Sequence, residues 1–318
     1  MANVRQVRPA RIGVLDIGSN TVLLLVLAAD GMVVRDEAHI TRLGQGVFAS
    51  GVLAPEAIAR TRAAVAELAA LARGAGAERV IAVGTEALRR ARDGEAFLAG
   101  LVAEGWVDAA RLITGEEEAE VAVEATRQRI GGEHEALAVI DVGGGSTEVA
   151  WRERATDAIS GLSLPLGSVR LTEALLPRHP IPDADLARLR AEVARASEPL
   201  AAALPHGLPG AAVVAVAATA TTLAALDLAL ARYDAERVEG HALDVAQLDA
   251  WLARLAPLSI AERSALPGLE PARADVIVAG LGALRGVLER LRVRRFSVSG
   301  RGVRHGVALR VLAGQMRF

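Results

Sequence analysis

The sequence predicts an α/β protein made of two related halves with a cleft between them. The first observation is a glycine-rich segment at 141–147, with the sequence DVGGGST, which follows the apolar run 136–140. The second is a shorter segment of the same kind at 16–21, with the sequence DIGSNT, which follows the apolar run 12–15. Repetition at the scale of a domain indicates duplication. We therefore expect one such loop in each half, with both loops facing the cleft.

The residue types of these loops suit phosphate and a hydrated cation. Glycine lets the backbone adopt positive φ and approach a ligand closely, and successive N–H groups can form an anion-binding nest. Ser146 and Thr147 add hydroxyl donors, and Asp141 at the strand end could hold hydrated Mg²⁺. For a glycine triplet on its own, a tight turn between two strands is an equally good interpretation.

Each loop leads into a second strand and not into a helix. The run 22–28, VLLLVLA, has no helical spacing, and the second loop is followed by the short run 148–151. In a dinucleotide-binding fold the glycine-rich loop opens a helix. The strand–loop–strand pattern therefore argues against that fold in both halves.

Composition limits the class of protein. The 318 residues allow one large or two ordinary domains, and 52% hydrophobic residues with only 3% aromatics predict cores of Ala, Leu and Val. All 36 basic residues are Arg, and the net charge of −2 gives no overall field that would attract nucleic acid. No Cys is present, so disulfides, thiol nucleophiles and Cys-bound metals are excluded.

No targeting or membrane segment is expected. The segment 1–9 is basic, but Asp16 and Gly18 interrupt the apolar run after it, which makes a poor signal peptide. No uninterrupted apolar run reaches the ~18 residues of a membrane span. We expect a cytoplasmic protein that does not bind membranes, and the lack of Cys fits a reducing compartment.

In the first half, alternating runs predict strands and helices in a defined order. Pro55 opens a helix whose apolar residues recur at helical spacing, and the Arg residues after Gly84 could clamp phosphate or form a solvated face. The expected elements are strands at 11–15, 22–28, 32–38 and 79–83, a helix at 55–73, and a helix carrying Arg89, Arg90 and Arg92.

The acidic segment that follows allows two interpretations. Thr114 is a candidate N-cap with Glu117 at the capping-box position, and acids are favourable in a first helical turn. Alternatively, one Glu of this run turns inward as a general base for water. The residues alone do not decide which Glu that would be.

The second half repeats the alternation. Glu148, seven residues after Asp141, could face the same metal across a hairpin or lie on the surface. Seven Arg between 285 and 304 form either a solvated face or a track for a polyanion. The expected elements are strands at 148–151, 213–217 and 296–299, a glycine turn entering a helix at 166–171, helices at 183–203, 223–230, 247–255, 259–265 and 271–291, and a closing helix to about 312.

Taken together, nine segments resemble the exopolyphosphatase/guanosine pentaphosphate phosphohydrolase (Ppx/GppA) family in its short two-domain form. They cover nearly the whole chain, in the family's order. The segments are DIGSNT (16–21), RLGQG (42–46), GTEALRRA (84–91), ITGEEEA (113–119), VIDVGGGSTEV (139–149), LPLGSVRLTE (164–173), ATATTLAAL (218–226), RADVIVAGL (273–281) and SVSGRGVRHG (297–306).

The resemblance implies a fold and an activity. The expected fold is actin-like (ribonuclease H-like), with duplicated lobes at 1–125 and 126–302, mixed sheets, and a closing helix at about 303–318 that packs back on the first lobe. The expected activity is Mg²⁺-dependent release of terminal phosphate from polyphosphate, with guanosine pentaphosphate as a further candidate substrate. Family members also suggest a homodimer and a binding site for guanosine tetra- or pentaphosphate.

The resemblance also assigns roles to residues. Glu118 matches the family's catalytic Glu, and Arg89 matches an arginine of its active site. The expected phosphate-binding residues are Gly18, Ser19, Asn20, Thr21, Gly143, Gly144, Gly145 and Ser146. The expected metal-side carboxylates are Asp16, Asp141 and Glu148.

One departure from the family's sequence pattern helps to choose among the alternative functions. Ala217-Ala218-Thr219 stands where a Gly-Gly-Thr turn is expected, and a Cβ there would crowd a nucleotide. This argues against an actin-like small-molecule kinase. A non-catalytic sensor of guanosine tetraphosphate would keep the loops but could lose the base, so Glu118 favours catalysis. A structural filament is the remaining alternative.

Overall fold

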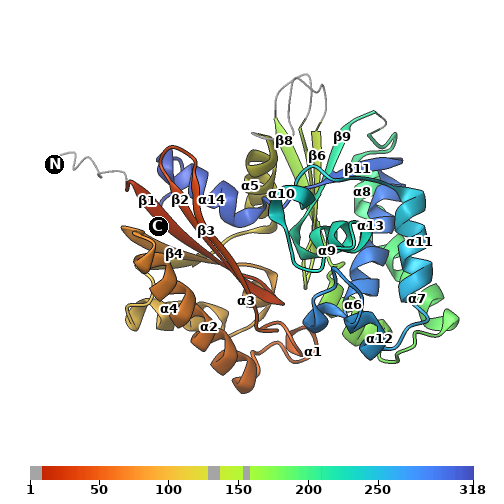
Figure 1. Cartoon of the computed structure of the whole chain (residues 1–318), viewed down its shortest axis with the longest axis horizontal. Coiled ribbons are helices and arrows are strands. Elements are labelled where there is room, and N and C mark those ends of the chain that lie inside the picture. Colours follow the sequence, from red (N-terminus) through yellow and green to blue (C-terminus); the bar gives the residue numbers. More distant parts are fainter. Residues whose placement is uncertain (1–8, 128–136, 153–157, 209) are drawn as a thin grey trace.

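Two lobes lie side by side, and each is built on one mixed β-sheet (Figure 1). The computed structural model describes residues 9–127, 137–152, 158–208 and 210–318. Within them, the first sheet has the strand order β3-β2-β1-β4-β5 and the second has the order β10-β11-β9-β6-β7-β8.

The first part of the chain contains the predicted strands and helices in the predicted order, together with α1, α4 and β5, which were not predicted. From Arg11 to Arg127 the elements are β1 (Arg11–Ile17), β2 (Thr21–Ala28), β3 (Val33–Ile40), α1 (Val47–Ser50), α2 (Pro55–Gly74), β4 (Arg79–Gly84), α3 (Glu86–Arg90), α4 (Gly94–Ala103), β5 (Ala109–Leu112) and α5 (Gly115–Arg127).

The second part contains more helices. Its elements are β6 (Leu137–Val142), β7 (Thr147–Arg152), β8 (Ile159–Leu164), α6 (Ser168–Leu175), α7 (Asp183–Ala196), α8 (Glu198–Ala203), β9 (Ala212–Val216), α9 (Ala217–Asp227), α10 (Ala235–Val238), β10 (Ala242–Asp244), α11 (Val245–Leu255), α12 (Ile260–Ser264), the 3₁₀ turn η1 (Pro271–Arg273), α13 (Ile277–Arg290), β11 (Arg295–Val298) and α14 (Val303–Leu312).

The two sheets repeat one topology. In the first, β1–β2 and β2–β3 are antiparallel, whereas β1–β4 and β4–β5 are parallel. The second repeats this with β6–β7 and β7–β8 antiparallel and β6–β9 and β9–β11 parallel, and adds β10 at the edge. The predicted α/β class, with two related halves and mixed sheets, is confirmed.

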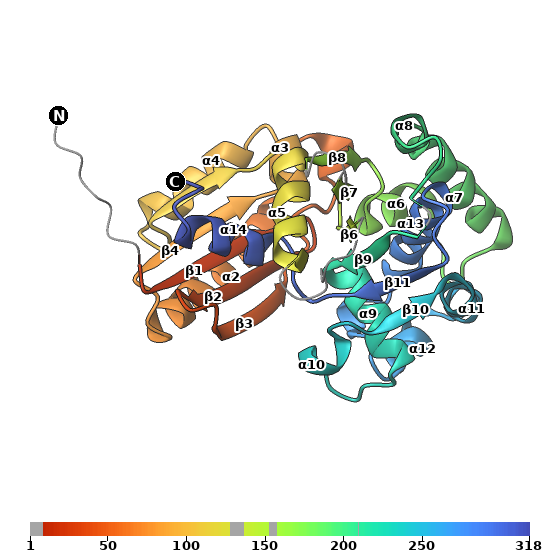
Figure 2. The same ribbon diagram turned by 90° about the horizontal axis from the view of Figure 1, so that it is seen from above.

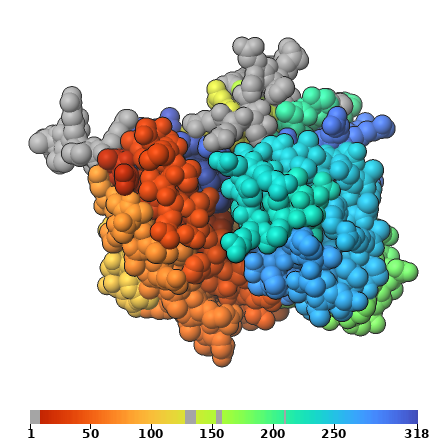
Figure 3. Space-filling view, viewed as in Figure 1, coloured from red at the N-terminus to blue at the C-terminus, as the bar shows by residue number. Residues whose placement is uncertain are grey.

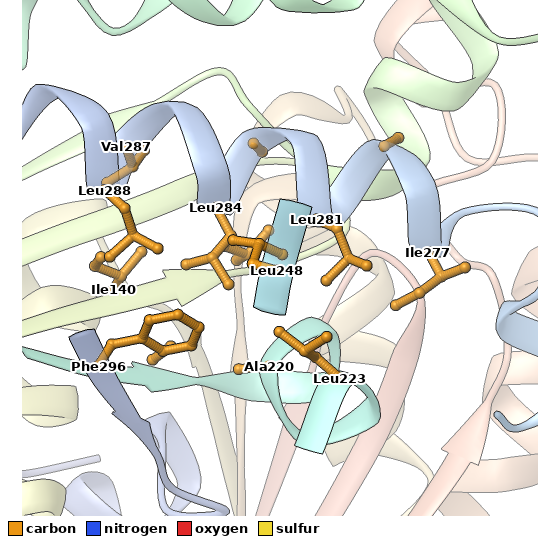
Figure 4. Packing of buried hydrophobic residues seen from close by; sticks show 14 of the residues in the cluster. Ile140, Ala220, Leu223, Leu248, Ile277, Leu281, Leu284, Val287, Leu288 and Phe296 are labelled. Carbon is orange, nitrogen blue, oxygen red and sulfur yellow. The ribbon is translucent and has the colours of Figure 1, made fainter. Parts of the chain in front are cut away.

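Aliphatic side chains fill both cores, as the composition predicts. In the second lobe α13 lies across the sheet, and its Leu281 and Leu284 pack toward Leu223, Ile140 and Phe296 (Figure 4). All five of these side chains are at most 3% exposed. Burying an aliphatic side chain of this size stabilises the fold by about 1.5–3 kcal/mol. Helix α13 therefore fixes the sheet that carries the second glycine loop.

Helices α5 and α14 each pack on the sheet of the other lobe. Helix α14 follows the second lobe in sequence but packs on β1 and β2, while α5 follows the first sheet and packs on β6, β7 and β8. The two helices lie against each other between the lobes (Figure 2). The lobe boundary expected at residue 125 stays a prediction. Because α5 packs on the sheet of the second lobe, a boundary before Gly115 is favoured.

Three predicted helices have different limits in the structure. The helix expected at 183–203 is broken at Ser197, because Pro199 lacks an N–H and would clash with the carbonyl four residues earlier. The helix expected at 271–291 is the turn η1 followed, after a gap, by α13. Helix α3 ends at Arg90, so Arg92 lies beyond it.

Some expectations fall on residues that the structure does not describe. They are the basic segment before Pro9 and the first residue of the apolar run at 136. Among the described residues, no helix combines the length and the apolar character needed to span a bilayer.

Substituting Gly306 with alanine should loosen the crossing of α5 and α14. A Cβ at Gly306 would lie 2.0 Å from the carbonyl oxygen of Val121, so the helices would have to move apart. Overpacking of this kind costs about 1–3 kcal/mol. We expect urea unfolding to give a correspondingly lower free energy of unfolding for Gly306→Ala.

The matched control is Gly74→Ala, at the end of α2, where an added Cβ meets no atom within 4 Å. Its free energy of unfolding should stay the same or rise, because Ala favours helix over Gly. Equal stability of the two variants would contradict the tight crossing.

Candidate active site

A cavity of about 110 Å³ lies between the lobes, where both glycine loops meet. Figure 3 shows the red-to-orange first lobe meeting the cyan-to-blue second lobe along a seam. The polar and charged residues that line the cavity are Asp16, Ser19, Asn20, Thr21, Thr85, Glu86, Glu118, Asp141, Ser146, Glu148, Ser168, Thr219, Arg273 and Arg304. The glycines that line it are Gly18, Gly143, Gly144, Gly145 and Gly302.

The two loops fold as the same turn. The N–H of Gly18 donates to the carbonyl of Thr21 at 3.0 Å, and the N–H of Gly143 donates to the carbonyl of Ser146 at 3.0 Å. Each turn follows an aspartate that is two residues earlier, at the end of a central strand. Duplication therefore places Asp16 and Asp141 at equivalent positions on opposite walls of the cavity.

The glycine triplet allows the two loops to approach each other closely, and its backbone does not adopt positive φ. None of Gly143, Gly144 and Gly145 has the left-handed backbone that the sequence suggested. A Cβ at Gly144 would lie 2.8 Å from the Cβ of Ser19, and a Cβ at Gly145 would lie 2.8 Å from the Oγ of Ser19. The absence of side chains thus lets the second-lobe loop rest directly on the first-lobe loop.

Five carboxyl groups line this cavity, and four of them, all except the arginine-paired Glu86, form one group. Asp141 and Glu148 are directly opposite each other in the β6–β7 register, so their side chains share one face of the sheet. Asp16 comes from the end of β1, and Glu118 comes from the first turn of α5. Of these four groups, all except Asp141 are at most 8% exposed. The opposition of Asp141 and Glu148 is the arrangement that a shared cation would need.

Burial and mutual repulsion raise the pKa of each of these groups. Burial raises the pKa of Asp16 to about 6, with Arg304 opposing and Glu148 adding to the effect. Burial, followed by the charge of Asp16, raises the pKa of Asp141 to about 7. Burial and Asp141 raise the pKa of Glu148 to about 7, against hydrogen bonds from Ser163 and Ser146. Burial and Glu148 also raise the pKa of Glu118 well above its ordinary value.

Arg89 contacts Glu118 and does not line the cavity. Its guanidinium donates to Glu118, to Glu86 at 2.9 Å and to the carbonyl oxygen of Ile113 at 2.6 Å. These contacts fix the position of the Glu118 carboxylate. A role of Arg89 as a phosphate ligand stays a prediction, because the cavity-lining residues do not include it.

The predicted capping box at the start of α5 is present. The N–H of Glu117 donates to Thr114 Oγ1 at 3.1 Å, and the N–H of Thr114 donates to Glu117 Oε2 at 2.9 Å. Glu116 is exposed, whereas Glu118 turns inward. The three consecutive acids therefore divide into a surface residue, a cap and a cavity residue.

The donor set suits a hard divalent cation. Carboxylate oxygens are ligands that Mg²⁺ prefers, and a cation would relieve the repulsion that raises these pKa values. Asn20 Oδ1, which is buried, has no hydrogen-bond partner in the described chain and offers a further acceptor. No three acidic, His or Cys side chains within the described ranges form a complete metal-binding group. Mg²⁺ does not need one, because it usually binds one or two carboxylates together with water and substrate phosphate.

Two arginines of the cavity were not predicted as site residues. Arg304 donates to both oxygens of Asp36 at 3.0 and 2.8 Å, and its charge lowers the pKa values of Asp16 and Asp141. Arg273 donates to Thr21 Oγ1 at 3.3 Å. Both arginines belong to segments that carry the family resemblance. Only the fold distinguishes them from other arginines, because it brings α14 and η1 back to the cleft.

The alanine pair at the start of α9 also lines the cavity. Ala217 adopts a φ of 64°, a left-handed conformation that costs a non-glycine residue about 1–2 kcal/mol. Thr219 Oγ1 donates to the carbonyl oxygen of Val142 at 3.1 Å and ties α9 to the second glycine loop. Ala217 thus holds a backbone conformation that glycine would adopt without this cost.

The chain resembles known proteins over nearly its whole length. A model of the Ppx/GppA phosphatase family matches residues 27–314. Exopolyphosphatase 2 of Mycobacterium tuberculosis is 35% identical over 318 residues, which cover 94% of this chain and 98% of that protein. Exopolyphosphatase 1 of Mycobacterium bovis is 31% identical and matches 95% of this chain and 88% of that protein.

Solved structures agree with the sequence comparisons. The Ppx/GppA family member of Aquifex aeolicus has a TM-score of 0.78 at 30% identity, covering 98% of this chain and 100% of that chain. An exopolyphosphatase from Cytophaga hutchinsonii has a TM-score of 0.86 at 24% identity, covering 96% and 99%. The expected actin-like two-lobe fold is confirmed. The chain belongs to the Ppx/GppA phosphatase family.

Proposed function

We propose that this protein is an exopolyphosphatase that releases terminal phosphate from inorganic polyphosphate. As a family member it is a hydrolase of phosphoanhydride bonds. The observation that carries the proposal is the buried group of four carboxyls facing two equivalent glycine turns in one cavity. The similarity to exopolyphosphatase 2 over 98% of that protein supports the choice of substrate.

The two turns are suited to hold the terminal phosphoryl group. Their hydroxyl donors, Ser19 and Ser146, line the cavity, and Arg273 adds a guanidinium that forms no ion pair among the described residues. Positioning and charge stabilisation supply most of the catalysis in phosphoryl transfer. Asp141 and Glu148, with Asp16 nearby, would hold the divalent cation, which when bound offsets charge on the bridging and terminal oxygens.

Glu118 is the proposed general base for the attacking water. In its ionised form it accepts a proton as the water oxygen bonds to the terminal phosphorus, and the bridging P–O bond breaks toward the shortened chain. Inorganic phosphate and a polyphosphate one unit shorter are the products. Arg89 holds the Glu118 carboxylate in place and opposes the rise in its pKa.

Finer features belong to the same proposal. We propose Mg²⁺ as the cation, guanosine pentaphosphate as a second substrate, a cytoplasmic location and a homodimer. The guanosine pentaphosphate proposal is supported by a Photobacterium profundum pyrophosphatase of guanosine-5′-triphosphate,3′-diphosphate that is 28% identical, of which this chain covers 59%. The alanines at 217 and 218 favour substrates without a nucleoside in the cavity.

Removing the proposed base should abolish most of the activity without unfolding the protein. Glu118→Gln keeps the size of the side chain but cannot accept the proton, so phosphate release from polyphosphate should fall roughly 10²–10⁴-fold. The exposed neighbour Glu116→Gln is the matched control and should retain the wild-type rate. Wild-type turnover by Glu118→Gln would exclude this residue as the base.

The cavity should make the metal-free protein less stable as pH rises. Asp16, Asp141 and Glu148 have folded-state pKa values of about 6 to 7, above the values of 3.8 to 4.5 in the unfolded chain. The folded state therefore binds more protons between about pH 4 and 7, and stability present below that window is lost as pH rises through it.

The measurement is thermal unfolding of the metal-free protein at pH 6 and pH 8, with and without Mg²⁺. We expect a lower Tm at pH 8, with Mg²⁺ restoring more of the Tm at pH 8 than at pH 6. Asp141→Asn should reduce both effects. A Tm that is independent of both pH and Mg²⁺ would contradict the proposed electrostatics.

A further inference from the structure

A second group of charges lies beside the cavity, on the seam between the lobes. We call Phe48, Glu86, Arg90 and Arg170 the seam cluster. Arg90 is the last residue of α3 in the first lobe, and Arg170 lies in the first turn of α6 in the second lobe. Its Cζ lies 5.2 Å from the centre of the Phe48 ring.

The seam cluster has more positive than negative charge. Glu86 accepts hydrogen bonds from Arg89 at 2.9 Å and from Arg90 at 3.0 Å, and Arg170 Nη1 lies 3.9 Å away. One carboxylate thus faces three guanidiniums, and Arg89 also donates to a second carboxylate, that of Glu118. Glu192 also faces Arg170, but it accepts two hydrogen bonds from Arg195.

Arg170 has a hydrogen-bond donor that is not used. Its Nη1 is buried and has no hydrogen-bond partner in the described part of the chain. The 3.9 Å separation from Glu86 is too long for a hydrogen bond. Burial and the charge of Arg90 lower the pKa of Arg170. A buried donor without an acceptor is unfavourable, so an anion that reached this atom and accepted its hydrogen bond would bind favourably.

The seam cluster adjoins the cavity wall. Glu86 itself lines the cavity, and so does Gly145, where an added Cβ would lie 2.6 Å from Phe48 Cζ. The cavity is small, so a long chain whose end is bound inside must continue outside it. Arg42 and Arg304, which are also near the cleft, each donate twice to one carboxylate and are less available.

We propose that Arg90 and Arg170 form a subsite for the phosphates that follow the terminal group of a polyphosphate chain. The proposal rests on the function proposed above and adds the path of the substrate. The terminal phosphoryl occupies the cavity among the carboxylates, and the chain leaves past Glu86 between the two arginines. Because they belong to different lobes, a chain bound to both also ties the lobes together.

The test is binding to an inactive protein. In the Glu118→Gln background, dissociation constants are measured for long-chain polyphosphate and for pyrophosphate, with Arg90→Gln and Arg170→Gln singly and together. We expect the double variant to weaken long-chain binding about tenfold or more, the value of one good charged hydrogen bond. Pyrophosphate binding should change less than twofold, and long-chain binding should depend less on salt.

The control is Arg73→Gln, which removes one exposed arginine of α2 that is paired with Asp108. It should leave both dissociation constants unchanged. Equal weakening for both ligands, no weakening for either, or no long-chain binding by Glu118→Gln itself would overturn the subsite. Phosphate release by the wild-type protein is measured in parallel, and its absence would refute the proposed function independently of the binding result.

Discussion

The repulsion among four buried carboxyl groups is the interaction on which the rest of the site depends. Taking Asp16, Glu118, Asp141 and Glu148 out of water while they face one another is costly, and Arg89 and Arg304 compensate only part of that charge. Such a group is maintained only where the surrounding fold holds it in place. A divalent cation would offset more of this negative charge and could also bind the oxygens of a phosphoryl group, which is why this cavity suits phosphoanhydride hydrolysis.

Duplication explains how the fold holds these groups. The same strand end supplies Asp16 in one lobe and Asp141 in the other, and the same turn follows each. The copies then differ where the chemistry requires it: the residue opposite Asp16 is Leu23, whereas the residue opposite Asp141 is Glu148. The exchange of α5 and α14 between the sheets adds Glu118 from one side and Arg304 from the other.

Local patterns offered candidates for the parts of the site that are close in sequence, and the family resemblance chose among them. The hairpin after Asp141 was sufficient to bring Glu148 opposite it, and the capping box at Thr114 marked the helix start that turns Glu118 inward. Arg273 and Arg304 could not be selected, because only long-range packing returns them to the cleft. The prediction of positive φ for the glycine triplet was wrong. These glycines instead allow close contact between the lobes, and no local sequence pattern reveals that contact.

The proposed reaction in this cavity is hydrolysis of the terminal phosphoanhydride bond of polyphosphate. The most direct measurement is phosphate release by the purified protein with Mg²⁺, compared side by side on short polyphosphate, long polyphosphate, guanosine pentaphosphate and ATP. We expect release from polyphosphate and much slower release from ATP, because Ala217 and Ala218 line the cavity and their Cβ atoms would crowd a nucleoside. No release from polyphosphate, or a preference for ATP, would contradict it.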